Sequence, residues 1–426
     1  MTQVDILILS NGPGEVTTWV RPVVKALRQE LGDDRSLVRI SVILSPCSNA
    51  SGKEAAIALS YPEVDRVQRA EHFWQFLLWG KTFENWDWRS RGVVVFLGGD
   101  QIFPVIIGKK LGYRTVIYAE WEARWHNWID RFGIMKPEVA VRVPQKYAHK
   151  FTVVGDLMLE AAEESLDSNS PLPITPSLKT ELIGLLPGSK AAKLAQGVPL
   201  CLAIAEYIHA KIPQTRFVIP VAPTLDLQTL ASFADPQKNS IAETFSFGGA
   251  SLIIPEDAKG KALLKTAKGL TVELWQENPA YHLLSQCCIC LTTVGANTAE
   301  LGALGVPMIV LLPTQQLDAM RSWDGLPGLL ANLPGLGTPF AKVINWSFLR
   351  FVRHKGLLAW PNIWAQEEIV PEIMGKVQPQ EVGEMVLDFL TNPEKLDDMR
   401  AKLRNIRGES GAAQKIAQIV GEEIGK

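Results

Sequence analysis

Two carboxylates in this chain follow apolar runs that have the composition of buried strands. Asp100 stands in LGGDQIF, just past the run GVVVFLGG (92–99), and Glu15 stands in SNGPGEV, after VDILILS (4–10). A carboxylate at the end of a parallel strand can accept a proton from an attacking hydroxyl, so both are candidate catalytic residues. Asp100 is equally suited to cap a helix that begins near Ile102, and the sequence leaves these two roles open.

The glycines before Glu15 resemble part of a dinucleotide-binding fingerprint. Gly12 and Gly14 have the required spacing, but the third glycine of that fingerprint would stand at residue 17, which is Thr17. The hypothesis that this turn binds a nicotinamide or flavin cofactor therefore loses most of its support, and we predict no cofactor. The turn is either a simple strand-to-helix connection or a place where a ligand approaches the backbone beside Glu15.

A second glycine-containing loop, LLPGSK (185–190), ends another apolar run. Ser189 can cap the helix that follows, and the free N–H groups of its first turn, with Lys190 and Lys193, would attract a phosphate. The loop is not a P-loop, which ends in GK[ST]. Gly188, Ser189 and Lys190 are therefore candidate residues for binding the phosphate of a ligand.

The stretch LTTVGANTAELGALGVPMIVLLP (291–313) places a glycine and polar side chains between two strand-like runs. Asn297, with Glu300 three residues later, resembles a capping box. Such a box does not explain Gly295 and the alanine after it, which leave room for a phosphate at a helix N-terminus. Glu300 could also accept hydrogen bonds from a ribose. We therefore favour a ligand site made of Gly295, Asn297, Thr298 and Glu300.

Tryptophan is concentrated between His72 and Trp128, a segment that also carries basic residues. Trp and Arg together suit the interface between a membrane and water. The alternative is a core helix with a cation–π surface. A second such stretch, NWSFLRFVRHKGLLAW (345–360), favours the membrane. We therefore predict a membrane or acceptor surface formed by Trp74, Trp79, Trp86, Trp88 and Arg89.

The composition is that of a folded globular protein, with 426 residues of which 47% are apolar and 21% charged. The formal net charge of −2 gives no bulk attraction for nucleic acid. The six histidines lack metal-ligand spacing, and the cysteines of QCCICLTT are typical of a buried strand, so we predict no metal. No apolar run reaches the ~18 residues of a membrane span, and the chain enters a strand at once, so we expect a cytoplasmic protein.

Strand-like runs alternate with helical segments twice along the chain. This pattern predicts an α/β fold of two doubly wound Rossmann-like domains that face each other across a cleft. We expect an N-terminal domain at 1–164, a linker rich in Ser and Pro at 165–179, a second domain at 180–378 and C-terminal helices at 379–426.

These motifs resemble those of the lipid-A-disaccharide synthase family, which are nucleotide-sugar transferases of the GT-B fold. They occur in that family's order: the Gly14-Glu15 turn, LGGDQIFPVIIGKKLGYRTVIYAE (97–120), VVGD (153–156), LLPGSK, TTVGANTAELGALGVPMIVL (292–311) and PNIWAQEEIVPEIM (361–374). The resemblance implies a sugar donor, which we take to be a UDP-sugar, on the second domain and a lipid-linked acceptor on the first. It implies transfer with inversion and without a metal, by an enzyme peripheral to the cytoplasmic face of a membrane.

The resemblance also implies roles for single residues. By similarity Asp100 would be the general base, Ser189 and Lys190 would hold the donor diphosphate, and Glu300 would hold the ribose. Asn297 would lie beside the phosphates, and Asn362 would lie in the cleft.

The chain departs from that family's pattern at several motifs. Glu15 is followed by Val-Thr-Thr instead of Ser-Gly-Asp, Asp156 stands in place of a histidine, and Lys190 in place of an arginine. A segment rich in Pro and Gly (318–340) has the look of an insertion. We therefore expect a divergent relative. Two alternatives stay open: a nucleotide-sugar 2-epimerase, against which the aromatic surface argues, and a catalytically silent nucleotide-sugar-binding protein.

Overall fold

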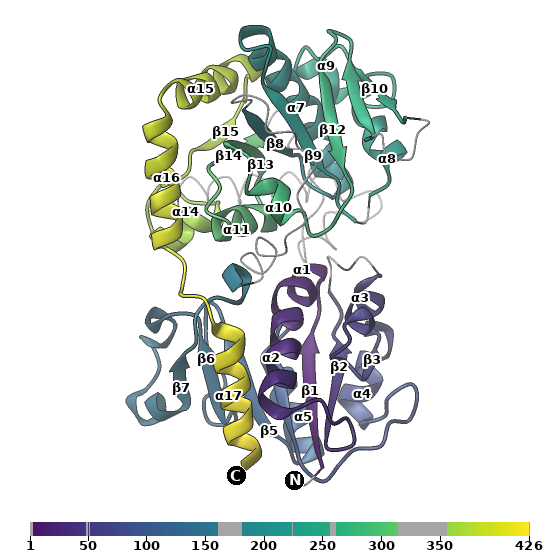
Figure 1. Cartoon of the computed structure of the whole chain (residues 1–426), viewed down its shortest axis with the longest axis vertical. Helices are drawn as coiled ribbons and strands as arrows, with labels where there is room; N and C mark the ends of the chain where they lie inside the picture. Colours follow the sequence, from purple (N-terminus) through teal and green to yellow (C-terminus); the bar gives the residue numbers. More distant parts are fainter. Residues whose placement is uncertain are drawn as a thin grey trace, which may run out of the picture. The chain divides into compact units, whose positions relative to one another are not determined.

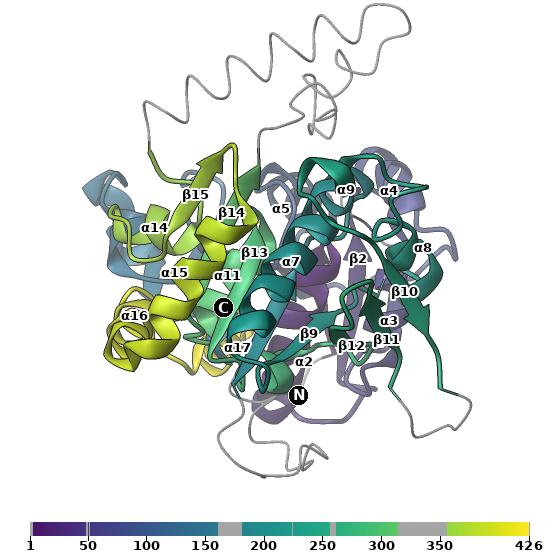
Figure 2. The same ribbon diagram turned by 90° about the horizontal axis from the view of Figure 1, so that it is seen from above.

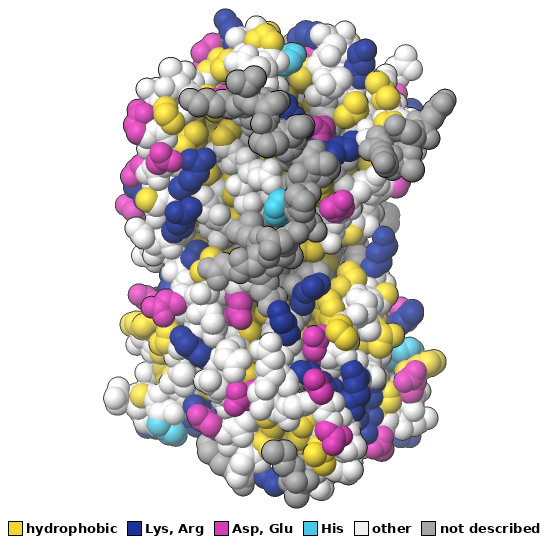
Figure 3. All heavy atoms as spheres, viewed as in Figure 1, with side chains coloured by type: hydrophobic (Ala, Val, Ile, Leu, Met, Phe, Trp, Pro, Cys, Tyr) yellow, Lys and Arg dark blue, Asp and Glu magenta, His cyan; other side chains and the backbone are white. Residues whose placement is uncertain are grey.

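The chain forms two compact units. Met1–Asp167 with Arg407–Lys426 make up the first, and Ser168–Ile406 the second. Each unit is built on its own sheet with helices against it (Figure 1; the same view with all heavy atoms, Figure 3). The computed structural model describes residues 3–47, 50, 52–160, 181–223, 225–255, 261–313 and 356–425.

A seven-stranded sheet forms the centre of the first unit, in the order β3-β2-β1-β4-β5-β6-β7, with every neighbouring pair parallel. All residues of β1 and β4 are buried, because a parallel sheet is covered on both faces. This burial is why the strands have continuous apolar sequences. The strands are β1 (Val4–Ser10), β2 (Val38–Leu44), β3 (Arg66–Gln68), β4 (Gly92–Phe96), β5 (Arg114–Ala119), β6 (Arg131–Ile134) and β7 (Phe151–Val153).

The segment after β1 is one helical stretch whose type changes along its length: α1 (Pro13–Glu15), the π-helix η1 (Val16–Val20) and α2 (Arg21–Leu31). The Thr18 hydroxyl donates to a backbone carbonyl one turn earlier, at 2.8 Å, and Pro22 has no N–H to donate. Both features weaken the regular α-helical ladder and favour a wider turn here.

The remaining helices of the first unit lie on the two faces of its sheet. α2 packs against α17, which also contacts β4, β5 and β6, while α4 packs against α5. The alternation along β1 separates the two cores: Ile6 and Ile8 face the first pair, and Leu7 and Leu9 the second. The elements are α3 (Glu54–Ser60), η2 (Ala70–His72), α4 (Phe73–Trp79), α5 (Ile102–Leu111), η3 (Pro137–Ala140), η4 (Gln145–Lys150) and α17 (Ala412–Gly425).

The second unit has an eight-stranded sheet in the order β10-β11-β12-β9-β8-β13-β14-β15. The six neighbouring strands β12-β9-β8-β13-β14-β15 are parallel, and β10 and β11 add an antiparallel edge. They are β8 (Leu182–Leu186), β9 (Arg216–Pro220), β10 (Ala250–Ile253), β11 (Leu263–Thr266), β12 (Thr271–Trp275), β13 (Ile289–Thr293), β14 (Met308–Pro313) and β15 (Glu372–Gly375).

The helix α7 (Ala191–Lys211) is the centre of the second unit's core and lies beside α15 (Figure 2). By length and composition it could cross a membrane, which the sequence analysis did not anticipate, but 72% of its apolar window is buried within the protein, as in a core helix. The other helices are α8 (Leu227–Ser232), α9 (Ile241–Thr244), α10 (Tyr281–Leu284), α11 (Ala296–Ala303), α14 (Trp360–Ala365), α15 (Pro379–Thr391) and α16 (Pro393–Asn405).

Two doubly wound parallel sheets confirm the predicted fold class. The expected C-terminal helices are shared between the units, because α15 and α16 lie in the second and α17 completes the first. The expected linker at 165–179, the inserted segment at 318–340 and the stretch 345–355 lie outside the described residues.

Gly155 allows the returning C-terminal chain to approach the first sheet. Its φ is +108°, and a Cβ there would overlap the Glu409 carbonyl oxygen, which accepts a hydrogen bond from Asp156 N at 2.8 Å. The contact joins the end of the β7 segment to the residues that lead into α17.

We expect Gly155→Ala to lower the free energy of unfolding by about 3 kcal/mol, because backbone strain and steric overlap add. Urea denaturation followed by tryptophan fluorescence measures this. Gly112→Ala is the matched control: its φ is +70°, but a Cβ there meets open space, so strain alone costs about 1–2 kcal/mol. Equal losses in both variants would contradict the close approach at Gly155.

Candidate functional site

The turns after β1 and β4 meet where the strand order of the first sheet reverses. Ligands of open α/β sheets bind at such a point, beyond the carboxyl ends of the strands. A Cβ at Gly98, whose φ is +129°, would lie 2.7 Å from Asn11 Oδ1 and 3.1 Å from Glu15 Cγ. The two turns are therefore in contact, and Glu15 lies against the loop that carries Asp100.

The carboxyl of Glu15 has a pKa above its ordinary value. Glu15 is half-buried, and this burial raises the pKa of its carboxyl, opposed only in part by a backbone hydrogen bond. A carboxylate with a raised pKa is a stronger base than one in water. The position of Glu15 is therefore compatible with the predicted catalytic role.

Asp100 takes part of the capping role that the sequence left open, although the residue at the N-cap position of α5 is Gln101. Its Oδ1 accepts a hydrogen bond from Ile102 N at 2.9 Å at the start of α5. Its Oδ2 lies 3.3 Å from a guanidinium nitrogen of Arg124, and the side chain is 45% exposed. The cap fixes the carboxylate's orientation while leaving it accessible, so capping and proton acceptance are not exclusive here.

Asn11 was not predicted as a site residue. Its Oδ1 is buried and has no hydrogen-bond partner within the described part of the chain. A buried acceptor without a donor costs about 1–3 kcal/mol, so a ligand hydroxyl that donates to it would relieve that cost. The signal in the sequence was its place directly after β1, at the carboxyl end of a strand.

In the second unit, the reversal of strand order lies between β8 and β13. The loop LLPGSK follows β8, and Val294 and Gly295 follow β13. Lys193, in the first turn of α7, connects the two loops, because its Nζ donates to the Val294 carbonyl oxygen at 2.7 Å. A Cβ at Gly188 would lie 3.0 Å from Lys193 Cβ, and one at Gly295 would lie 2.9 Å from Lys193 Nζ. The structure thus brings both predicted donor loops together around one cation.

The helix caps differ from those predicted. The N-cap of α11 is Gly295, with φ +151°, and no side chain caps it, so Asn297 lies inside the helix and the capping box with Glu300 does not form. The N-cap of α7 is Lys190, and the exposed Ser189 does not cap it. At neither helix start does the side chain of the N-cap residue cap the N–H groups.

Burial raises the pKa of Glu300 to about 7. Thr298 is fully buried and has structural contacts: its hydroxyl donates to Gly295 O at 2.8 Å and accepts from Trp360 N at 3.2 Å. It fixes the loop beside Gly295 and joins it to α14.

Asn362 is fully buried and uses all its hydrogen-bonding groups inside the second unit. Its Nδ2 donates to Val370 O at 2.8 Å and to Glu372 Oε1 at 2.7 Å, and its Oδ1 accepts from two backbone N–H groups at 2.8 and 2.9 Å. These four hydrogen bonds leave no polar atom of Asn362 to bind a nucleotide sugar. We therefore reassign it, against the sequence-based prediction, as a residue that holds α14 against β15 and the segment that precedes it.

The predicted aromatic surface divides into two parts. Trp74 and Trp79 of α4 are 53% and 67% exposed. Trp86 and Trp88 are half-buried, with the Arg66 guanidinium 4.3 and 4.9 Å from their rings.

Arg89 is only 12% exposed and does not belong to a membrane surface. Its guanidinium donates to backbone carbonyls at the starts of β1 and β2, including Val4 O at 2.9 Å. Its backbone N donates to Asp5 Oδ2 at 2.9 Å. Trp86, Trp88 and Arg89 therefore have structural contacts, of the cation–π and ion-pair kind.

A buried charge cluster in the first unit was also missed. Arg407 is ion-paired with Asp156, and its second guanidinium nitrogen lies 4.0 Å from Glu120 Oε1. Burial raises the pKa of Glu120 to about 8; Arg407 opposes this shift and Asp156 adds to it. Asp156 is the residue that stands in place of the family's histidine, and its partner Arg407 lies 251 positions later in the sequence.

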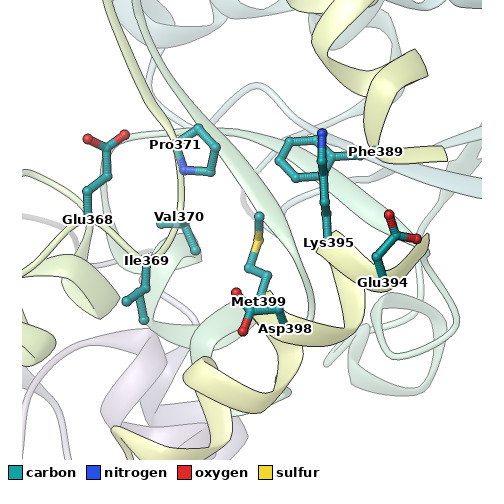
Figure 4. Close-up of a pocket in the computed structure, with 9 residues that line it drawn as sticks. All are labelled: Glu368, Ile369, Val370, Pro371, Phe389, Glu394, Lys395, Asp398 and Met399. Carbon is teal, nitrogen blue, oxygen red and sulfur yellow. The ribbon is translucent and has the colours of Figure 1, made fainter. Parts of the chain in front are cut away.

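A cavity of about 520 Å³ in the second unit lies away from the two donor loops. Its lining, which includes Val370, Phe389 and Met399, comes from the segment before β15 and from α15 and α16 (Figure 4). It lies at the amino end of β15, whereas the donor loops follow the carboxyl ends of β8 and β13. Among the described residues no group of three His, Cys, Asp or Glu side chains could hold a metal ion.

Two parallel α/β sheets, each with its loops at a strand-order reversal, place the chain in the GT-B fold class. A Listeria monocytogenes structure, provisionally named as a UDP-N-acetylglucosamine 2-epimerase, is 13% identical with a TM-score of 0.55, over 97% of this chain and 95% of its own. MnaA of Staphylococcus aureus, solved with UDP, is 11% identical with a TM-score of 0.53, over 100% and 97% of the two chains. At these identities the likeness shows the fold alone.

The chain is a divergent relative of the lipid-A-disaccharide synthases. It is 22% identical over 305 residues to that of Geobacter metallireducens, which covers 70% of this chain and 63% of the relative. It is 23% identical over 249 residues to that of Geobacter sulfurreducens, covering 58% and 50%. The chain thus spans about half to two thirds of the length of the curated relatives it matches. No family model matches the chain.

The raised pKa of Glu120 predicts a stability that depends on pH. Its folded pKa of about 8 lies above the unfolded value of about 4.3, so the folded state binds more protons between these values. The free energy of unfolding should therefore fall as the pH rises through this range, by on the order of 5 kcal/mol. Glu120→Gln, which cannot ionise, should lose less stability than the wild type over the same range.

Denaturation in urea at a series of pH values measures this difference. Glu122→Gln is the control, because Glu122 is 66% exposed in a surface pair with Arg124. If Glu120→Gln and the wild type show the same dependence of the unfolding free energy on pH, Glu120 is ionised over the whole range and the prediction is wrong.

Proposed function

We propose that this protein is a glycosyltransferase that moves a sugar from a nucleotide sugar to a lipid-linked acceptor with inversion. The observation that carries the proposal is the junction of the two glycine-containing loops around Lys193 in the second unit. The relationship to the lipid-A-disaccharide synthases supports the reaction class. UDP is the proposed nucleotide, supported by the UDP bound to the Staphylococcus aureus protein of the same fold.

The second unit is the proposed donor domain. The helices α7 and α11 begin at the two loops, so their N–H groups and positive dipole ends are available to a diphosphate. Lys190 and Lys193 add positive charge, and Gly188 and Gly295 let the phosphates approach the backbone. These groups would stabilise the negative charge that develops on the leaving nucleoside diphosphate, without need of a metal. Glu300, inside α11, is the proposed ribose contact.

The first unit is the proposed acceptor domain. In the proposed step, Asp100 accepts the proton of the acceptor hydroxyl as its oxygen attacks the anomeric carbon, and the bond to the diphosphate breaks on the opposite face. The hydrogen bond from Ile102 N holds the Asp100 carboxylate in place, which favours such a role. Glu15 and the acceptor atom of Asn11 lie together at the turns after β1 and β4, the proposed acceptor crevice, and would bind or orient the acceptor.

A 2-epimerase of nucleotide sugars remains the second candidate. The observation in its favour is that proteins of this activity share the fold over nearly the whole chain. An epimerase acts without a lipid, and the exposed tryptophans of α4 then have no role. A silent nucleotide-sugar-binding protein is the third reading, and loss of transfer with retained donor binding separates it from an enzyme.

Asp100→Asn tests the base. Because asparagine caps helices as well as aspartate does, the variant should keep its fold. We expect transfer to fall by about 10²–10⁴-fold, the range attributed to general-base catalysis. Transfer of labelled sugar from UDP-sugars to a lipid-acceptor extract measures this, and the shift in unfolding temperature with UDP shows that donor binding survives.

Glu15→Gln is the matched comparison, since it removes the other carboxylate of the crevice. If Asp100→Asn kept full transfer while Glu15→Gln abolished it, the base would be Glu15. If the wild type bound UDP but transferred nothing, the silent-binder reading would replace the transferase.

The lipid acceptor requires the first unit to work at a membrane, on its cytoplasmic face in our proposal. Trp74, Leu78 and Trp79 on α4 are more than half exposed, and Ile106 of α5 is 37% exposed. Lys110 of α5 donates to the Leu78 carbonyl oxygen, which places a cation beside these side chains. Exposed aromatic rings next to lysines are the features of an interfacial membrane contact.

We expect the double variant Trp74→Ser/Trp79→Ser to bind vesicles of phosphatidylglycerol and phosphatidylethanolamine at least about tenfold more weakly, because each ring contributes apolar area to the contact. Vesicle sedimentation measures the partitioning. Val141→Ser, which removes a 77% exposed apolar side chain from η3's C-terminal end, is the control and should bind as the wild type does. Unchanged binding by the double variant would exclude α4 as the membrane contact.

A further inference from the structure

A cavity of about 400 Å³ lies at the open edge of the first sheet, beside β3. It is lined by the end of β3, the turn η2 and the segment 83–86, and it is separate from the crevice at β1 and β4. This volume is within the range of small-molecule sites and is large enough for a single sugar ring. Neither the proposed transfer reaction nor the membrane contact uses it.

Gln68, at the end of β3, has an unused donor in the wall of this cavity. Its side-chain oxygen accepts a hydrogen bond from Phe83 N at 2.9 Å, so the amide cannot be turned around without placing two donors face to face. Its Nε2 is then directed away from that bond and has no hydrogen-bond partner among the described residues, although Gln68 is only 3% exposed. Such a donor costs free energy until an acceptor reaches it.

Aromatic and acidic side chains also line the cavity. The rings of His72 and Phe83 are stacked, with centroids 4.2 Å apart, and Phe83 is 66% exposed, so its other face is open. Glu84 Oε2 accepts from Trp86 Nε1 at 3.0 Å, which fixes both side chains at the cavity. Glu71 is a second carboxylate in the lining.

The charge of the lining distinguishes between classes of ligand. Two glutamates against the single arginine, Arg69, disfavour an anion such as a phosphate. Carboxylates that accept from hydroxyls, an amide that donates to one and an open aromatic face that packs against ring C–H groups are what a neutral sugar requires. We propose that this cavity is a saccharide-binding subsite, with Gln68 as the hydrogen-bonding group and Phe83 as the stacking platform.

Saturation-transfer NMR on the full chain with methyl β-D-glucoside tests the proposal. We expect saturation of the sugar's ring protons, and binding about five- to tenfold weaker in Gln68→Met, which keeps the side-chain size but removes the amide. Phe83→Ala, a substitution of an exposed ring that leaves the fold intact, should weaken binding similarly. Trp128→Ala, at another half-exposed aromatic residue outside the lining, should bind the sugar as the wild type does.

The test has clear contrary outcomes. No transfer to the sugar, or equal binding by the wild type and both cavity variants, would overturn the proposal; the second result would place the sugar elsewhere, for example at the donor loops. Displacement of the sugar by inorganic phosphate would show an anion site instead. None of these results depends on transferase activity, so the proposed function and this subsite can fail separately.

Discussion

The reversal of strand order in each parallel sheet is the constraint on which both candidate sites depend. Where neighbouring strands send their crossovers to opposite faces, the two loops at their carboxyl ends remain uncovered by either helix. At β1 and β4 this brings Asn11, Glu15 and the loop of Asp100 together, and at β8 and β13 it brings LLPGSK to Gly295. Polar and glycine-rich sequence at these four strand ends, and apolar sequence along the strands, follow from that one topological fact.

A second group of interactions attaches the last helix of the first unit to its sheet. This helix, α17, follows the whole second unit in the sequence. The chain returns to the first unit at the Asp156–Arg407 ion pair and the Gly155 contact. A buried ion pair adds little net stability, because desolvation offsets the attraction, but removal of one partner leaves an uncompensated charge. The pair therefore serves mainly to fix where the returning chain meets β5 and β7. It also accounts for the departure at Asp156, since a histidine there would leave Arg407 facing Glu120 alone.

Particular residues show how much of the fold and of the sites could be predicted from the sequence. The apolar runs and the loop positions of Gly188, Gly295 and Asp100 were sufficient to predict two doubly wound sheets and the loops at their strand ends, because strand burial and strand ends depend on local sequence. The roles of Asn362 and Arg89 could not be predicted in this way. Their hydrogen bonds go to backbone atoms brought close only by the folded sheet, and no spacing in the chain reveals such partners. The cluster of Glu120, Asp156 and Arg407 was missed for the same reason.

The aromatic segment from His72 to Trp88 shows how one composition can serve several environments. Its residues divide between a buried core (Phe73, Phe76), a cation–π contact at Arg66 and an exposed face on α4. The proposed saccharide cavity ends at His72, the residue directly before α4 and its exposed tryptophans. A polar cavity and an apolar surface that are adjacent in this way match the two ends of an amphiphile, with a sugar ring in the cavity and its lipid along α4. The two proposals for this region are therefore compatible with one ligand class, a glycolipid whose sugar ring occupies the cavity and whose lipid lies along α4.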